Sequence, residues 1–492
     1  MNIVGGLMLL VGGSAFAGGW QPVPMVSTAS RASGCLGGEG GQWPRAMAVD
    51  AHDGMFVLWG TDVGGLYRSL DGGASWEPCN VGYAPRGTAA LAIDPGNPDR
   101  VLSVGANSVA FDGHGLWLSE DRAASWRHVL PATIGGSHDR RVQVAFDPYT
   151  FDAPAGFTRR VYWSRIAEDR PSWGTPEIRP GVWRSDDGGR TWREIPGSAR
   201  AGGAILKIRP SGGRLYAGVP DGLLISDDGG ASFRRTFTGT VTGLDVSRYA
   251  PDRVWLSTPR AIWRSDDAGV TFRRLPASPA TPDGILHEVS VSPADPERLT
   301  TWREAPQWRW TRHASSDGGA TWNDAVIDSA GAFLPYNVRQ GIVVWHQTDP
   351  RVGWSTGGDW PTRTEDGGAT WRWSGDGVNG MLVGGAWSFS LADPDVVFVG
   401  SQDYYGAVTI DGGATWRYTN VSGHGWGGFC YGGYAATRQL LVAGKADGWG
   451  SPRELRVSFD GGREALRVRV HPRTRDAWVA TSCYGIWKHP PP

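Results

Sequence analysis

Apolar and polar residues alternate in short stretches that recur along the whole chain. A first alternating stretch, Ala46–Asp50, is followed by a more continuous apolar one, Met55–Trp59, and then by Gly65–Ser69. Gly and Asp residues separate these stretches, and Trp76 opens a fourth. A period of two predicts strands, and turn residues at close spacing predict hairpins between them. We therefore expect an all-β protein built from units of four short strands.

The hairpin between the third and the fourth strand carries the most regular motif of the chain. Ser69–Trp76 reads S-x-D-x-G-x-S-W, and the pattern returns around Asp187, Asp228, Asp267, Asp317, Asp366 and Asp411, with degenerate copies at Asp121 and Asp460. An aspartate in such a turn accepts hydrogen bonds from backbone amides, and the preceding Ser or Thr ties the hairpin further. Because the motif recurs with every unit, we interpret these aspartates as structural and exclude them as catalytic residues.

Ten such units follow one another over residues 46–492, which is the pattern of a β-propeller with one blade per unit. The tenth unit has three strands, and Val23–Ser27, in the N-terminal segment 18–45, can supply the fourth. A fourth strand supplied in this way would leave no free sheet edge between the last blade and the first. We therefore predict one closed ring of about ten four-stranded blades. The alternative is a split into seven and three blades, which leaves the last three without a way to close.

Composition and the N-terminus bear on compartment and partners. The 48 Lys and Arg residues nearly balance the 49 Asp and Glu residues, without a basic patch, so we expect no nucleic-acid partner. Residues 1–17 read as a secretory signal peptide, with apolar Leu7–Val11 before the small-x-small site Ala15–Ala17. A misassigned start codon is the alternative. Since no later stretch is apolar and long enough to span a bilayer, we expect a secreted or periplasmic protein without a membrane partner.

The loop between the second and the third strand of the first unit carries a second motif. Gly60–Arg68 reads G-T-D-V-G-G-L-Y-R and resembles the T-D-[IV]-G-G-x-Y-R motif of inverting glycoside hydrolases that cut xyloglucan and related β-glucans. The resemblance implies that Asp62 is catalytic. Counting blades, it places the second catalytic aspartate at Asp403, within Gly400–Gly406. That family has two seven-bladed propellers, whereas ten blades in one ring resemble the sortilin-type receptor domain. The function is therefore predicted as polysaccharide hydrolysis, and the alternative is a binding propeller for peptide or glycan.

Inverting hydrolysis needs two carboxyl groups about 6.5 to 9.5 Å apart, one protonated and one ionised. Ring closure would bring Asp62, Asp403 and Asp447 to one mouth of the propeller, while Asp359 and Glu304 are reserve candidates. Aspartates in such loops also cap turns, and this remains the alternative for each of them. The mechanism needs no metal and no organic cofactor. We find no metal-ligand spacing among the isolated histidines or the four cysteines, Cys35, Cys79, Cys430 and Cys483, whose disulfide pairing the sequence leaves open.

Aromatic residues outside the repeated motif form a further group of candidates. Sugar rings present apolar C–H faces that pack on aromatic planes. We therefore predict substrate contacts for five aromatic residues on loops: Trp360, Tyr404, Tyr405, Trp426 and Trp449. Packing in the core is the alternative for each. The expected partner is a polysaccharide or oligosaccharide, bound by a monomer.

Overall fold

The computed structural model describes most of the chain after residue 45. The described residues are 46–62, 64–106, 113–132, 143–165, 180–307, 309–327, 342–356, 360–378, 383–401, 406–418, 429–435, 437–439, 441–446, 454–458, 466–470, 473, 477–481 and 485–489. The predicted signal peptide and the segment 18–45 lie outside them. The fold is all-β, as predicted, and its helices in this part of the chain are the short 3-10 turns η1 (Pro148–Thr150) and η3 (Ser198–Ala201).

The first sheet consists of β1 (Ala46–Val49), β2 (Val57–Gly60), β3 (Leu66–Ser69) and β4 (Glu77–Pro78), antiparallel and in chain order. Val49 pairs with Val57, which pairs in turn with Ser69, so the predicted strands and hairpins are confirmed. Buried side chains of this sheet pack against neighbouring sheets on both faces, which is why the stretch that forms β2 is almost continuously apolar rather than alternating.

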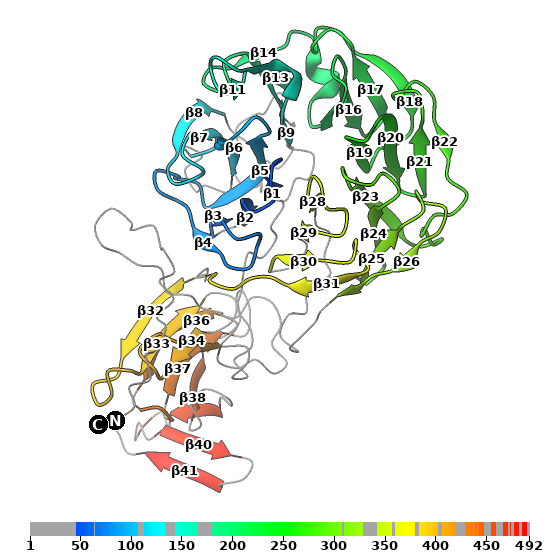
Figure 1. The fold of residues 1–492 in the computed structure, drawn as a ribbon. Coiled ribbons are helices and arrows are strands. Elements are labelled where there is room, and N and C mark those ends of the chain that lie inside the picture. The colour runs from blue at the N-terminus through cyan, green and yellow to red at the C-terminus, as the bar shows by residue number, and fades with distance from the viewer. Residues whose placement is uncertain are drawn as a thin grey trace, which may run out of the picture.

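Six further sheets follow the same plan (Figure 1). Their strands are β5 (Gly87–Asp94), β6 (Asn97–Ala106), β7 (Gly115–Ser119) and β8 (Arg127–Pro131); β9 (Gln143–Phe146), β12 (Val161–Arg165), β13 (Gly181–Ser185) and β14 (Arg193–Glu194), with the hairpin β10 (Phe151–Asp152) and β11 (Phe157–Thr158); β15 (Ile205–Ile208), β16 (Leu215–Val219), β17 (Gly222–Ser226) and β18 (Arg234–Thr238); β19 (Gly243–Ser247), β20 (Ala250–Thr258), β21 (Ala261–Ser265) and β22 (Arg273–Arg274); β23 (Ile285–Val291), β24 (Leu299–Ala305), β25 (Arg309–Ser315) and β26 (Asn323–Asp324); and β28 (Val343–Trp345), β29 (Gly353–Ser355), β30 (Thr362–Thr364) and β31 (Thr370–Trp373), joined by β27 (Val326–Ile327).

The repeated aspartate holds its own hairpin, as predicted. In the first sheet, Asp71 Oδ1 accepts from Ser69 Oγ at 2.7 Å and from the Ser75 amide at 2.8 Å. Ser69 Oγ in turn accepts from the Gly73 amide at 2.7 Å. Equivalent bonds surround Asp121, Asp187, Asp228, Asp267, Asp317, Asp366 and Asp411. These carboxylates are engaged in turn bonds, so their role is structural.

Each of the first four sheets also forms a hydrogen bond to the aspartate hairpin of the sheet that follows it. A side chain of one sheet donates to the carbonyl that directly follows the aspartate in the next hairpin. The contact joins each of the first four sheets to the next one. In chain order, the donor and the carbonyl are Arg68 and Arg122, Arg100 and Gly188, Arg184 and Gly229, and Tyr216 and Ala268. The same kind of contact therefore identifies which sheets are neighbours.

By this criterion the first sheet follows the seventh. Trp354 of β29 donates through Nε1 to the carbonyl of Gly72 at 2.9 Å. Trp76 of the first sheet donates to the carbonyl of Ser374, just as Trp126 of the second donates to that of Cys79. The first strands contact one another around the circle, including β28 with β1 (Figure 1). The structure therefore has a ring of seven sheets, and the prediction of one ring of ten is not confirmed.

The remaining strands lie beside this ring (Figure 1). β32 (Val383–Phe389), β33 (Val397–Ser401), β34 (Gly406–Thr409) and β35 (Arg417–Tyr418) form an eighth four-stranded sheet, and Val399 and Trp416 share a core cluster with Trp59. The predicted ninth and tenth units join into one sheet of six strands: β36 (Phe429–Ala435), β37 (Leu441–Ala446), β38 (Glu454–Ser458), β39 (Leu466–Val470), β40 (Ala477–Thr481) and β41 (Gly485–His489). The proposed closing strand Val23–Ser27 lies outside the described residues.

Candidate functional site

The motif around Asp62 lies on the face of the ring opposite the aspartate hairpins. It connects β2 to β3, whereas the repeated hairpin connects β3 to β4, and in an antiparallel sheet consecutive connections lie at opposite ends. The corresponding connections of the other sheets open on the same face. Ligands of scaffolds of this kind are commonly bound where loops from several elements converge, so this face is the first place to look for a site.

Hydrogen bonds hold the Asp62 loop in one shape. Thr61 Oγ1 donates to the carbonyl of Gly65 at 2.9 Å and accepts from the Gly64 amide at 2.7 Å. The Gly65 amide donates to the carbonyl of Arg86 at 2.7 Å. Gly65 has a positive φ of 75°, and a Cβ there would lie 2.4 Å from Asn80 Oδ1, so only glycine fits. The two glycines of the motif therefore serve a tight turn that positions Asp62.

The Asp62 side chain is buried within this loop. The residue is only 4% exposed, and Thr61 beside it is wholly buried. A carboxyl group in such a place is held in a defined orientation and is largely shielded from water, two properties that acid–base catalysis uses. Asp62 thus satisfies the requirement of a rigid position, which a solvated surface aspartate would not.

Most of the other predicted site residues lie outside the described residues. This is so for Asp403, Tyr404, Tyr405, Trp426 and Trp449, and also for the reserve candidates Asp359 and Asp447. Their predicted roles, and the distance from Asp62 to a second carboxyl group, stay predictions.

Trp360 is described, and it is 1% exposed and packs edge to face on Trp373 with ring centroids 6.4 Å apart. Both faces of its indole are covered, so the structure corrects the prediction that it stacks on a sugar.

The reserve candidate Glu304 belongs to a different cluster. Its Oε2 lies 2.8 Å from His287 Nε2, and the His287 ring is 5.8 Å from the ring of Trp310. Glu304 is at the end of β24 and His287 is in β23, so both belong to the sixth sheet. Of the two, His287 also lines the cavity that the ring encloses.

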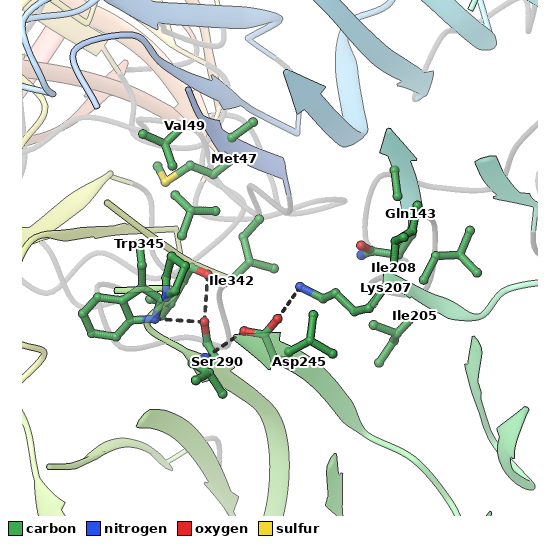
Figure 2. A pocket seen from close by; sticks show the side chains of 18 of the residues that line it. Met47, Val49, Gln143, Ile205, Lys207, Ile208, Asp245, Ser290, Ile342 and Trp345 are labelled. Atoms are coloured by element: carbon green, nitrogen blue, oxygen red, sulfur yellow. Dashed lines mark hydrogen bonds and ion pairs between the residues drawn. The ribbon is translucent and has the colours of Figure 1, made fainter. Parts of the chain in front are cut away.

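The inner strands of the seven sheets surround a cavity of about 870 Å³. The side chains on one part of its wall are apolar, among them Met47, Val49 and Ile342 (Figure 2). The sheets on the opposite part contribute Lys207, Asp245 and other polar groups. A mostly apolar cavity with a few convergent polar groups has the composition of a small-molecule site.

The polar part of the wall is a chain of contacts across neighbouring sheets (Figure 2). Lys207 Nζ of β15 lies 2.7 Å from Asp245 Oδ1 of β19, and Asp245 Oδ2 accepts from the Val291 amide of β23 at 2.7 Å. Ser290 Oγ donates to the carbonyl of Val343 and accepts from Trp345 Nε1, both at 3.1 Å. The network links the fourth, fifth, sixth and seventh sheets.

Glu288 is the most unusual residue of this wall. It lies at a bulge in β23 with a positive φ of 52°, a conformation that is costly for a residue other than glycine. Thr301 Oγ1 donates to its carbonyl at 2.6 Å, and its amide donates to the carbonyl of Thr242 at 3.2 Å. Its Oε1 accepts from the Val343 amide at 3.2 Å. Burial raises the pKa of Glu288 to about 7, although that bond and the charge of Lys207 act in the opposite direction.

The residues of the cavity were not predicted from the sequence, although a signal was present. Lys207, Asp245 and Glu288 lie in β15, β19 and β23, the first strands of their sheets, where most neighbouring residues in the sequence are apolar. A charged residue in a first strand faces either a neighbouring sheet or the axis of the ring. To predict a cavity residue from such a charge, one must know that the first strand of each sheet lies innermost in the ring.

Glu288 gives a testable pH dependence of stability. Between its ordinary pKa of 4.5 and the native value of about 7, the folded protein holds a proton that the unfolded chain has lost. The free energy of unfolding should therefore fall as pH rises through this interval, by about 3 kcal/mol. Glu288→Gln should remove this contribution, so that the difference in stability from wild type grows steadily from pH 4.5 to 7.5, as measured by urea unfolding.

Glu297→Gln is the matched control, because Glu297 is 42% exposed and pairs with Arg253 at the surface. Its stability difference from wild type should stay nearly constant over the same interval. A constant difference for Glu288→Gln as well would show that Glu288 titrates normally in the folded protein.

Neither a metal site nor a membrane-spanning helix is found in the described part of the chain. No group of three or more His, Cys, Asp and Glu side chains there is arranged to hold a metal ion. No helix among the described residues has the length and hydrophobicity needed to cross a membrane. Of the four cysteines, Cys79 is buried and free.

In sequence, part of the chain is similar to xyloglucanases. A xyloglucanase of Paenibacillus sp. is 28% identical over 186 residues, 34% of this chain and 16% of that protein. A xyloglucanase of Acetivibrio thermocellus is 29% identical over 183 residues, 33% of this chain and 20% of that protein. An oligoxyloglucan-reducing end-specific xyloglucanase of Emericella nidulans is 28% identical over 193 residues, 35% and 21% of the two chains. The matched segments thus span about a fifth of these relatives.

In structure, the similarity extends over nearly the whole chain. The GH74 xyloglucanase from Xanthomonas campestris superposes with a TM-score of 0.57 at 16% identity, over 91% of this chain and 85% of that one. An ancestral GH74 enzyme gives a TM-score of 0.64 at 15% identity, over 96% of this chain and 69% of that one. No family model matches the chain. The predicted resemblance to xyloglucanases is confirmed, in sequence over a third of the chain and in fold over most of it.

Proposed function

We propose that the protein is a glycoside hydrolase that cleaves xyloglucan or a similar β-glucan. The observation that carries the proposal is the loop Thr61–Arg68, which has the residues of the xyloglucanase motif and holds Asp62 buried in a rigid turn. The similarity of the chain to xyloglucanases in sequence and in fold supports the same activity. The proposed substrate, xyloglucan, is inferred from the relatives, and the proposed catalytic group, the Asp62 carboxyl, is inferred from the loop.

The proposed mechanism uses two carboxyl groups and inverts the anomeric carbon. One carboxylic acid protonates the glycosidic oxygen, while the other, as a carboxylate, takes a proton from the water that attacks the opposite face of the sugar. Asp62 is one of the pair, and Asp403 is the proposed second member. Neither a metal nor an organic cofactor takes part in these steps.

We also propose where and in what form the protein acts. A polysaccharide is too large to enter a cell intact, so the enzyme would meet it after export, directed by residues 1–17. The paired carboxyl groups would come from one chain, so a monomer would suffice for catalysis.

The proposal is tested by measuring new reducing ends from purified xyloglucan, mixed-linkage β-glucan and xylan. We expect release from xyloglucan, unchanged when EDTA is added, and little or none from xylan. Release from none of these polysaccharides, by protein that still binds xyloglucan, would instead support a binding propeller.

A further inference from the structure

The cavity of the ring is a built site that is separate from the Asp62 loop. It is enclosed by the first strands of the seven sheets, whereas Asp62 lies on the connection between β2 and β3. Alanines from the second and third sheets, Ala90 and Ala145, line it and leave room that larger side chains would fill. Its volume of about 870 Å³ is within the range of small-molecule sites.

The polar groups of the cavity wall have unused hydrogen-bonding capacity. An ammonium group has three donors, and Lys207 places its Nζ against Asp245 at a single close contact of 2.7 Å. A carboxylate has two oxygens, and among the described residues only the Val343 amide, at 3.2 Å, donates to Glu288. A donor and an acceptor therefore remain for a ligand at neighbouring positions of the wall.

The backbone at Glu288 indicates that this arrangement is held in place by its surroundings. The positive φ falls at the bulge of β23, and the Glu288 backbone packs so closely on Gly243 of the fifth sheet that a Cβ there would lie 2.4 Å from the Glu288 Cα. Strained residues of this kind cluster at ligand sites, where the surrounding structure fixes them. Burial keeps the pKa of Glu288 at about 7, so its carboxyl group can either accept or donate a hydrogen bond near neutral pH.

We propose that this cavity binds a neutral sugar unit through a pair of adjacent hydroxyl groups. One hydroxyl accepts from Lys207 and the other bonds to Glu288, while the C–H face of the ring packs on Ile205, Ile208 or Ile342. The cavity is lined by two cations, Lys207 and Arg248, and by two carboxyl groups, Asp245 and Glu288, so a neutral ligand fits this balance of charge better than an anion or a cation. The inference does not depend on the proposed hydrolysis, because binding here needs neither Asp62 nor bond cleavage.

The test is calorimetric titration of the full chain with xylose, glucose and cellobiose, and with cyclohexanol as a ring of similar size without a diol. For a ligand of this size we expect a Kd of about 1 mM, and no measurable binding of cyclohexanol. Lys207→Met should weaken sugar binding at least tenfold, and Ala145→Leu should do so by filling the cavity. Glu297→Gln, remote from the cavity, should bind sugar like wild type.

The two proposals fail in different ways. Hydrolysis without any change in sugar affinity in Lys207→Met and Ala145→Leu would overturn the cavity site and leave the hydrolase intact. The cavity site would also be overturned if the wild-type protein bound none of the three sugars up to about 50 mM, a concentration far above the expected Kd. Because Ala145→Leu keeps every polar group, loss of binding in both folded variants, checked by circular dichroism, is the supporting result.

Discussion

Replacing Asp62 by Asn is expected to lower kcat on xyloglucan by about 10²- to 10⁴-fold, the contribution of a positioned general acid or base. The amide has nearly the same size and shape, so it can occupy the buried place of the carboxyl group. It cannot exchange a proton at neutral pH. The initial rate of reducing-end formation measures the loss, and the KM should change little because the substrate is held elsewhere along the chain.

Asp221→Asn is the matched control for Asp62→Asn. Asp221 lies on the equivalent connection of the fourth sheet, between β16 and β17, and pairs with Arg235 at the surface. We expect its activity to stay within twofold of wild type. In Asp62→Asn, one limb of the pH–rate profile should also disappear. An active Asp62→Asn enzyme with an unchanged profile would remove Asp62 from the mechanism.

The strands and hairpins of the fold could be predicted because their causes are local. The predicted strand Ala46–Asp50 matches β1 (Ala46–Val49) within one residue, since side-chain alternation and turn residues determine a hairpin. The role of the repeated aspartates followed from recurrence, and the bonds around Asp71 confirm it. These features need no information from residues that are distant in the chain.

The number of sheets in the ring depends on one contact between distant segments, and for that reason it was not predictable from the repeats. Trp354 and Gly72, which meet at the junction of the seventh and first sheets, are 282 positions apart. The same four-strand pattern continues beyond this point, so the eighth unit looked like a further blade. What separates a ring of seven from one of ten is the angle between successive sheets, which depends on side-chain packing.

The candidate site was predictable to the extent that it resides in one loop. Thr61–Arg68 carries its own turn chemistry in the spacing of Gly64 and Gly65, and the structure shows that turn. Trp360 was misassigned because a tryptophan outside the repeated motif can face either the core or solvent, and local sequence does not distinguish the two. Glu288 was missed because its surroundings come from distant segments: its backbone packs on Gly243 of the fifth sheet, and its carboxyl group accepts from the Val343 amide of the seventh.

Trp354→Ala is expected to destabilise the protein by about 3 to 5 kcal/mol, the cost of removing a fully buried tryptophan. Trp354 is 1% exposed, and its Nε1 bond to Gly72 connects the seventh sheet to the first. A Cβ on Gly73 would lie 2.6 Å from the same nitrogen, so the hairpin is packed directly against the indole. The loss should appear as a lower urea midpoint, with faster amide hydrogen exchange in β1, β2, β28 and β29 before other sheets open.

Trp255→Ala separates this effect from the general cost of a large cavity. Trp255 occupies the equivalent position in the fifth sheet, since the residue before it pairs with Ser265 just as Gly353 pairs with Thr364, and it is wholly buried. A similar loss of stability is expected, but with faster exchange in the fifth and sixth sheets. If Trp354→Ala cost less than about 1 kcal/mol, the range of an ordinary surface substitution, or left exchange in β1 unchanged, the seventh sheet would not be packed on the first. The ring would then have to close through other sheets, as a larger number of blades requires.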